Sequence, residues 1–197
     1  MEDSLAPGVV QPLLRGRFGH VYRYEELFPS TQRLLEPSDP EGAVAVAEQQ
    51  SAGRGRLGRT WIAPARTSIL ASVLLRPPVA PPRLPELCLV SGGAVAEAIA
   101  EEIDIEPAIK FPNDVLIDGR KVAGILAESS DGRVVLGIGL NVNQTREQLP
   151  PDADTEPTSL RLEVGKPLER APLLATVLQR LELAYDKWVA TETATSG

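Results

Sequence analysis

Residues 53–60 read GRGRLGRT and combine three glycines with three arginines in one short stretch. Glycine lets a loop move and lets main-chain atoms approach a ligand closely. Arginine side chains are forked donors that fit carboxylate and phosphate oxygens. The stretch fits the dinucleotide-binding pattern G-x-G-x-x-G, and it misses a Walker A loop only because Arg59 stands where that loop has lysine. These residue types indicate a loop suited to an anionic ligand.

Both nucleotide-binding patterns require a helix directly after the glycines, because the N-terminus of that helix faces the phosphates. The residues that follow, RTWIAPARTS, do not favour a helix, since Trp61 and Ile62 are weak helix formers and Pro64 falls in the second turn. The sequence therefore argues against both patterns. Two interpretations stay open from the residues alone: a solvated flexible loop, or a mobile lid that folds over an anionic ligand.

A second motif, KFPNDVLIDGRKVAGILAE at Lys110–Glu128, places a lysine at the end of a strand with polar residues beside it. Together with EQQSAGRGRLGRTW (Glu48–Trp61) and GIGLNVN (Gly137–Asn143), it resembles the biotin protein ligase family. The three motifs stand in the order and spacing of that family. The resemblance covers the chain from Tyr24 to Trp188.

Members of that family bind biotin in an apolar slot and use ATP and magnesium to form biotinyl-adenylate. They then pass the biotinyl group to a lysine of a biotin carboxyl carrier domain. The resemblance implies the same activity here, with biotin and ATP as substrates, magnesium as cofactor, and unassigned metal ligands. By motif position it implies biotin-binding roles for Ser30, Thr31, Gln32, Gln50, Gly53, Arg54, Gly55, Arg56, Lys110 and Gly124. It implies adenylate-binding roles for Arg54, Arg56, Trp61, Lys110, Asn113 and Asn141.

Three of the residues in these motifs are catalytic candidates. A carboxylate that attacks a polyphosphate joins two anions, so cations at the reacting oxygens lower the barrier. Arg56 and Lys110 are the candidates for that role. The amine of the acceptor lysine must lose a proton before it attacks, and Asp114 is the candidate that assists this proton transfer.

Each assignment also has a purely structural alternative, and two residues depart from the family pattern. Phe111 stands where most members have tryptophan, and Gln32 stands where asparagine is usual. The structural alternatives are an N-cap for Ser30 or Thr31, core packing for Trp61, a turn after Pro112 for Asn113 and Asp114, a bulge or packing contact at Gly124, and an ordinary edge-strand lysine at Lys110.

Short strands surround the motifs that carry these residues. Apolar strands are predicted at residues 43–48 and 68–75, before and after the glycine loop, and the second reads as buried on both faces. Asp118-Gly119 and Asp131-Gly132 are hairpin signals, so residues 115–143 are predicted to form an antiparallel meander.

Helices are predicted at residues 86–103 and at the end of the chain. In the last helix, apolar residues recur at three- and four-residue spacing: Leu174, Val177, Leu178, Leu181, Tyr185 and Trp188. The predicted fold class is therefore α+β, a mixed and largely antiparallel central sheet with flanking helices. The resemblance adds that this is the biotin/lipoyl protein ligase catalytic fold, which is similar to class II synthetases.

The composition fits one catalytic domain in a reducing compartment. The chain has 197 residues, a net charge of −7 and one cysteine, Cys88. The acidic balance disfavours DNA binding, no apolar run is long enough to cross a bilayer, and the single cysteine fits the cytoplasm. Residues 1–14 are predicted to be a poorly ordered tail and residues 15–197 the catalytic domain. The family's C-terminal β-barrel is expected to be absent or truncated.

Two other functions compete with the ligase. A lipoyl or octanoyl transferase shares the fold, but it differs at the glycine loop and lacks a KWPND-like or KFPND-like motif. A non-catalytic biotin-binding protein, or a partly active truncated homologue, is suggested by the expected loss of the barrel. An exposed sheet edge in the meander would also permit a homodimer.

Overall fold

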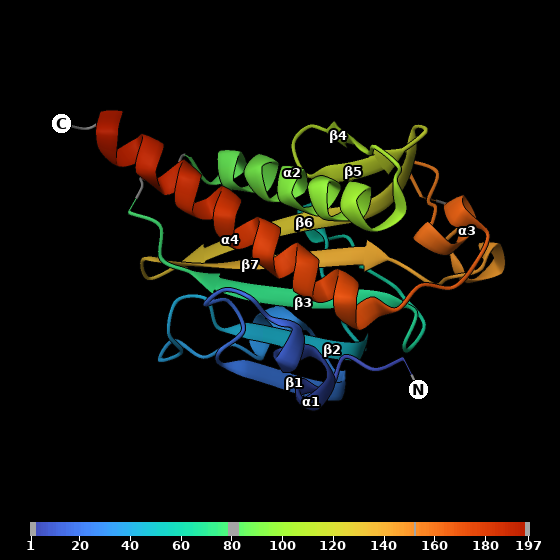
Figure 1. The fold of residues 1–197 in the computed structure, drawn as a ribbon, viewed down its shortest axis with the longest axis horizontal. Coiled ribbons are helices and arrows are strands. Elements are labelled where there is room, and N and C mark those ends of the chain that lie inside the picture. Colours follow the sequence, from blue (N-terminus) through green and yellow to red (C-terminus); the bar gives the residue numbers. More distant parts are fainter. Residues whose placement is uncertain (1–2, 79–82, 152, 196–197) are drawn as a thin grey trace.

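The computed structural model describes residues 3–78, 83–151 and 153–195. Its centre is a seven-stranded sheet with the strand order β1-β2-β3-β7-β6-β5-β4 (Figure 1). The strands are β1 Tyr22–Phe28, β2 Val44–Gln50, β3 Ser68–Leu75, β4 Ala108–Lys110, β5 Asp114–Ile117, β6 Arg120–Ser130 and β7 Arg133–Asn141.

Only β1 and β2 run parallel among the described strands, and the other neighbouring pairs are antiparallel. The two predicted hairpin turns close the meander of β5, β6 and β7. Asp118 and Gly119 have φ values of 48° and 77°, and Asp131 and Gly132 have values of 51° and 74°. Two successive positive φ values characterise a type I′ turn, which matches the twist of the flanking strands. The predicted α+β class and the largely antiparallel sheet are confirmed.

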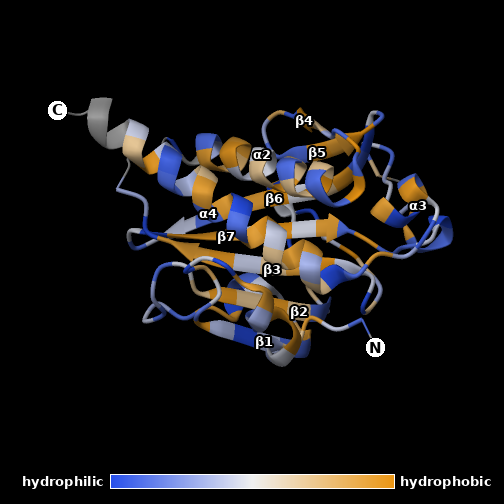
Figure 2. Ribbon diagram, in the orientation of Figure 1, coloured by the Kyte–Doolittle hydropathy of each residue, from blue (hydrophilic) through white to orange (hydrophobic). Residues whose placement is uncertain are grey.

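Two long helices, α2 Leu84–Ile103 and α4 Arg170–Thr195, cover one face of this sheet (Figure 1). The periodic apolar residues predicted for the last helix are all buried. On β7, Leu136, Ile138 and Leu140 belong to the main hydrophobic core. Figure 2 shows apolar residues, in orange, along the strands beneath the two helices. The alternate positions of β7 therefore face the opposite side of the sheet.

The N-terminal segment is packed, so the expectation of a poorly ordered tail is wrong for residues 3–14. This segment forms helix α1 Pro7–Val10 and the 3₁₀ turn η1 Gln11–Leu13, and Leu5 and Val10 are fully buried. The main-chain N–H of Leu5 donates to Oε1 of Glu48 at 2.8 Å. These contacts join residues far apart in the sequence, so local composition does not reveal them.

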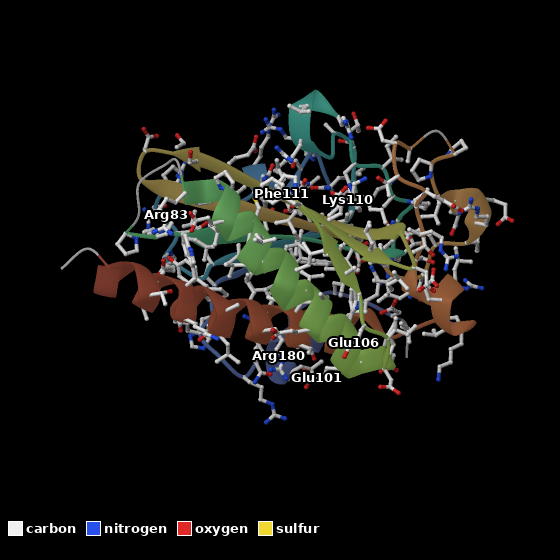
Figure 3. The ribbon with its side chains drawn as sticks, turned by 90° about the horizontal axis from the view of Figure 1, so that it is seen from above. Arg83, Glu101, Glu106, Lys110, Phe111 and Arg180 are labelled. Atoms are coloured by element: carbon white, nitrogen blue, oxygen red, sulfur yellow. The ribbon has the colours of Figure 1, made fainter. Side chains whose placement is uncertain are left out.

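Short elements and loops lie on the face of the sheet away from α2 and α4, where Figure 3 shows the loop around η3 in teal. These elements are η2 Thr31–Arg33 and η3 Arg56–Gly58. After β7 come η5 Arg146–Gln148 and helix α3 Leu160–Val164. Among the described residues, no helix is both long and apolar enough to span a membrane.

Candidate active site

A cavity of about 470 Å³ opens on the sheet face that the long helices leave free. Its walls come from η2, the glycine loop, β5, β6, β7 and the loop at residues 150–157. Most of the predicted site residues line it: Ser30, Thr31, Gln32, Gln50, Arg54, Gly55, Arg56, Trp61, Asn113, Asp114, Gly124 and Asn141. Gly53 and Lys110 do not line it.

One end of the cavity is polar and buried. The main-chain N–H of Thr31 donates to Oε1 of Gln50 at 2.7 Å, and the hydroxyl oxygens of Thr31 and Ser72 lie 2.8 Å apart. Ser30 precedes η2 but makes no side-chain cap hydrogen bond, so the N-cap alternative fails for its hydroxyl. The amide of Gln32 donates to the main-chain oxygen of Leu126 at 3.2 Å.

The Oε1 atom of Gln32 is also buried, and it accepts no hydrogen bond within the described part of the chain. Buried polar atoms in folded proteins are almost always paired. Together with the hydroxyls of Ser30 and Thr31 and the amide of Gln50, this free acceptor suits a small ligand with amide-like N–H and C=O groups.

Two paired glycines form a floor in the middle of the cavity. Gly124 of β6 pairs with Gly139 of β7, and the indole of Trp61 lies over both. A Cβ atom on Gly139 would lie 2.5 Å from Cε2 of Trp61, and one on Gly124 would lie 3.0 Å from Cζ3. Trp61 therefore packs against the cavity floor. Gly124 lies at a packing contact, which is one of the two structural alternatives considered for this residue.

The glycine loop lies along the cavity without a following helix. Only a single 3₁₀ turn, η3, forms within it, and residues 59–67 contain no helix. Arg54 forms an ion pair with Glu128 at 2.7 Å, and Arg56 donates to Oδ1 of Asn113 at 3.0 Å. The dinucleotide and Walker A patterns are thus misleading here, and the loop is held against the sheet by its arginines.

Gly53 occupies its position for steric reasons. A Cβ atom there would lie 2.3 Å from the main-chain oxygen of Trp61, closer than real contacts allow. Gly58, in contrast, has a φ of 77° and nothing near its missing side chain. The first glycine permits a close approach of two chain segments, and the last permits a turn.

The lysine in the cavity is Lys121, which sequence reasoning missed. Its Nζ lies 2.8 Å from Oδ1 of Asp114, an ion pair without hydrogen-bond alignment, and 5.6 Å from the ring centroid of Trp61. Lys110 is exposed at the end of β4 (Figure 3), and its Nζ donates to Oγ1 of Thr155 at 2.9 Å. The structure therefore does not bring Lys110 to the cavity lining, where Lys121 is the lysine present among the described residues.

A β-bulge explains why Lys121 points into the cavity. Between β5 and β6 the register shifts, so that Val115 pairs with Ala123 but Leu116 pairs with Lys121. The extra residue on β6 puts Lys121 and Gly124, three positions apart, on the same face of the sheet. The sequence could have pointed to Lys121, because it lies within the same motif as Lys110. No sequence pattern predicts the bulge that turns its side chain into the cavity.

Asn141 and Asn113 serve the cavity through other residues. The amide of Asn141 donates to the main-chain oxygen of Thr158 at 3.0 Å and accepts from Gln144 at 2.9 Å. The amide of Asn113 donates to the main-chain oxygen of Ile125 at 3.0 Å while it accepts from Arg56. Both amides are therefore anchored inside the protein, and Asn113 holds a cation at the cavity.

Comparisons with known proteins identify the family that this chain resembles. The description "Biotin/lipoate A/B protein ligase family" matches residues 24–144. The biotin--[acetyl-CoA-carboxylase] ligase of Mycobacterium tuberculosis is 42% identical over 160 residues, covering 79% of this chain and 59% of that protein. The bifunctional ligase/repressor BirA of Bacillus subtilis is 36% identical over 171 residues, covering 82% and 53%. The chain thus spans between half and three-fifths of these two relatives.

This chain covers a larger fraction of two other proteins. The biotin--[acetyl-CoA-carboxylase] ligase of Paracoccus denitrificans is 36% identical over 166 residues, with 78% of this chain and 68% of that protein aligned. The solved structure of biotin protein ligase from Aquifex aeolicus, in complex with biotin and ATP, is 35% identical with a TM-score of 0.79. That match covers 87% of this chain and 72% of the other.

Proposed function

The chain belongs to the biotin/lipoate A/B protein ligase family, and from this premise we propose that it is a biotin protein ligase. In the proposed reaction, biotin and ATP form biotinyl-adenylate and pyrophosphate. The biotinyl group then passes to one lysine of a biotin carboxyl carrier domain, and AMP is released. The observation that carries the proposal is that one cavity joins a polar amide-binding end, around Thr31 and Gln50, to the cations Arg56 and Lys121.

The first step brings two anions together. An oxygen of the biotin carboxylate attacks the α-phosphorus of ATP, a new P–O bond forms, and the bond to pyrophosphate breaks. Arg56 and Lys121 supply positive charge at the reacting oxygens, which stabilises the charge that builds up in the transition state. Trp61 offers a flat apolar surface for the adenine, and its buried indole N–H is a donor left free by the described residues.

The second step needs an unprotonated amine from the acceptor lysine. The amine attacks the carbonyl carbon of the adenylate, an amide bond forms, and AMP leaves with the bonding electrons. Asp114 lies against Lys121 rather than free in the cavity, so its proposed role is to orient that lysine. Proton transfer from the amine remains a secondary proposal for the same carboxylate.

Magnesium and a homodimer complete the proposal. Among the described residues no three His, Cys, Asp or Glu side chains gather to hold a metal ion, so we propose that magnesium enters with the phosphates of ATP. The meander strands β5, β6 and β7 each have a neighbour on both sides, so the expectation of an exposed edge in the meander is wrong. Strand β1 forms one edge of the sheet and is the candidate dimer contact instead. The cytoplasm, where ATP and carboxylases occur together, is the proposed location.

Biotin-dependent exchange of labelled pyrophosphate into ATP tests the first step. We expect exchange with biotin and none with lipoate or octanoate. Lys121→Gln should lower the exchange rate by roughly 10²-fold or more, as loss of a transition-state donor does. Lys187→Gln, on the exposed side of α4, is the matched control and should leave the rate unchanged. Exchange with lipoate instead of biotin would indicate a lipoate-activating ligase and contradict the proposal.

A further inference from the structure

Helix α3 and strand β6 are joined by one nearly buried carboxylate, that of Glu163. Its Oε2 accepts from Nη2 of Arg120 at 2.8 Å, its Oε1 accepts from the hydroxyl of Thr158, and its side chain is only 7% exposed. We propose that Glu163 is a positioning residue for Lys121. Through Arg120 and Thr158 it holds the stretch of β6 from which that lysine points into the cavity. The inference rests on the proposed ligase function.

The main chain at Lys121 has a different neighbour from the rest of β6. Strand β7 pairs with β6 from Ala123 onward, so it does not extend to Lys121. Residues 156–158 take its place. The main-chain N–H of Lys121 donates to the main-chain oxygen of Glu156 at 2.7 Å, and the N–H of Thr158 donates to that of Lys121 at 2.9 Å. This segment and β5 therefore support the bulged part of β6 from both sides.

The carboxylate of Glu163 fixes both partners of this pairing. Arg120 directly precedes Lys121 on β6, and Thr158 supplies the N–H that the main chain of Lys121 accepts. A carboxylate that is nearly removed from water is unfavourable unless it is paired, and Glu163 accepts from a guanidinium and a hydroxyl at once. These contacts therefore hold the segment and the strand in one arrangement.

The effect of Glu163 on the reaction must be indirect, because Glu163, Arg120 and Thr158 do not line the cavity. Without the carboxylate, residues 156–158 can shift relative to β6, and the bulge that directs Lys121 loses one of its two supports. The amide of Asn141 still donates to the main-chain oxygen of Thr158 at 3.0 Å. We therefore expect displacement of the lysine rather than unfolding of the sheet.

The size of the expected effect follows from this displacement. Misplacing a group by about 1 Å can cost up to about 10²-fold in rate, so we expect Glu163→Ala to lower biotin-dependent pyrophosphate exchange roughly tenfold. Glu163→Gln keeps one acceptor oxygen and should lose less. Biotin affinity should not change, because the amide-binding end of the cavity is formed by Thr31 and Gln50.

The first test is a double-mutant cycle read out by pyrophosphate exchange. In the Lys121→Gln background, Glu163→Ala should lower the rate by less than about twofold, because the lysine through which it acts is already gone. A merely structural role predicts the same loss in both backgrounds. Glu106→Ala, at an exposed position between α2 and β4 (Figure 3), is the matched control and should leave the rate unchanged.

The second test follows the position of Lys121 itself and requires no turnover. The chain has four lysines, and three of them are exposed: Lys110, Lys166 and Lys187. Lys121 instead lies over the Trp61 ring, which should shield its signal in NMR spectra of the chain with isotopically labelled lysine. Glu163→Ala should move this signal toward those of the other three lysines, and Glu163→Gln should move it less far.

An unchanged exchange rate in Glu163→Ala would overturn the proposal. An equal loss in the Lys121→Gln background would do the same, as would a Lys121 signal that stays in place. The ligase function fails separately: a parent chain without biotin-dependent exchange, whose Lys121 signal nevertheless moves in Glu163→Ala, has the positioning contact without the reaction.

Discussion

Lys121 illustrates how much a single residue depends on the backbone beneath it. The extra residue on β6 turns its side chain toward Asp114, and the ion pair then holds the ammonium group over the Trp61 ring. Without the bulge, strand alternation would direct Lys121 and Gly124 to opposite faces. A mutation of this lysine should therefore affect chemistry rather than folding.

A comparison of two lysines tests this at the residue scale. Lys110→Gln removes one exposed contact with Thr155, so the rate of biotin-dependent pyrophosphate exchange should change by less than about fivefold. Lys121→Gln should lower it by roughly 10²-fold or more. Parallel exchange assays check both. The reverse ranking would return the catalytic role to Lys110 and contradict the assignment of Lys121.

The same pair of residues marks the limit of what the sequence reveals about the site. Motif position was sufficient to select Thr31, Gln50, Arg56 and Trp61, which do line the cavity. It selected Lys110, which does not line the cavity, and missed Lys121, which does, because a lysine at the end of a strand and one beside a bulge look alike in a sequence. The bulge depends on pairing between β5 and β6, and no local pattern records it.

At the scale of elements, the glycine-rich end of β7 is shaped by the indole that lies across it. A methyl group on Gly139 would meet the Trp61 ring at 2.5 Å, and the ring would have to leave its present position. The hairpins on either side of β6 follow directly from their Asp-Gly turns. The position of Trp61 does not, since a loop of irregular structure carries it to the sheet.

Gly139→Ala should displace Trp61 while leaving the sheet intact. We expect adenylate-analogue affinity to fall by about tenfold or more, from steric overlap at a packed contact, and the tryptophan fluorescence to change. Gly8→Ala is the matched control, because nothing lies within 4 Å of the added carbon, and neither property should change. Calorimetry and fluorescence provide the readouts. Unchanged affinity in Gly139→Ala would mean that the indole is not part of the ligand site.

An ion pair beside β1 makes a prediction about pH. Arg23 donates two hydrogen bonds to the carboxylate of Asp39, at 2.8 and 2.7 Å, and this contact lowers the pKa of Asp39 below its usual value. A lowered folded-state pKa stabilises the fold above the unfolded pKa of about 3.9, and the stabilisation is lost as pH falls through the folded value.

Asp39→Asn should therefore lower the melting temperature at pH 7. The difference from the parent chain should shrink as the pH is taken below about 4, where the parental carboxylate becomes protonated. Thermal unfolding followed by circular dichroism at pH 7, 5, 4 and 3 measures this. A difference that stays constant over the series would show that the charge of Asp39 does not stabilise the fold.

At the scale of the whole molecule, Arg170 joins segments that are far apart in the sequence. Its guanidinium is fully buried and lies 2.7 Å from Glu48 on β2 and 2.7 Å from Asp3, and it donates to the main-chain oxygen of Ser68 at 2.9 Å. One side chain thus connects the N-terminal segment, β2, β3 and the start of α4. This network explains why residues 3–14 are packed although their composition predicted a tail.

Arg170→Met should destabilise the fold by about 3–5 kcal/mol, because it leaves Glu48 buried without its cation. Arg15→Met changes an exposed arginine to the same residue and should cost less than about 0.5 kcal/mol. Urea unfolding of the three proteins gives the free energies. Equal stability of the Arg170 variant and the parent would mean that the network contributes little to holding the N-terminal segment.

Ligase activity requires that this chain complete both steps, adenylate formation and transfer to the carrier. The most direct measurement is the intact mass of a biotin carboxyl carrier domain after incubation with the chain, biotin, ATP and magnesium. We predict that each carrier gains one biotinyl group, and that the gain is lost when ATP is omitted or the acceptor lysine is replaced by arginine. An unchanged carrier mass under full conditions, while calorimetry records biotin binding, would contradict the account and leave a biotin-binding protein without ligase activity.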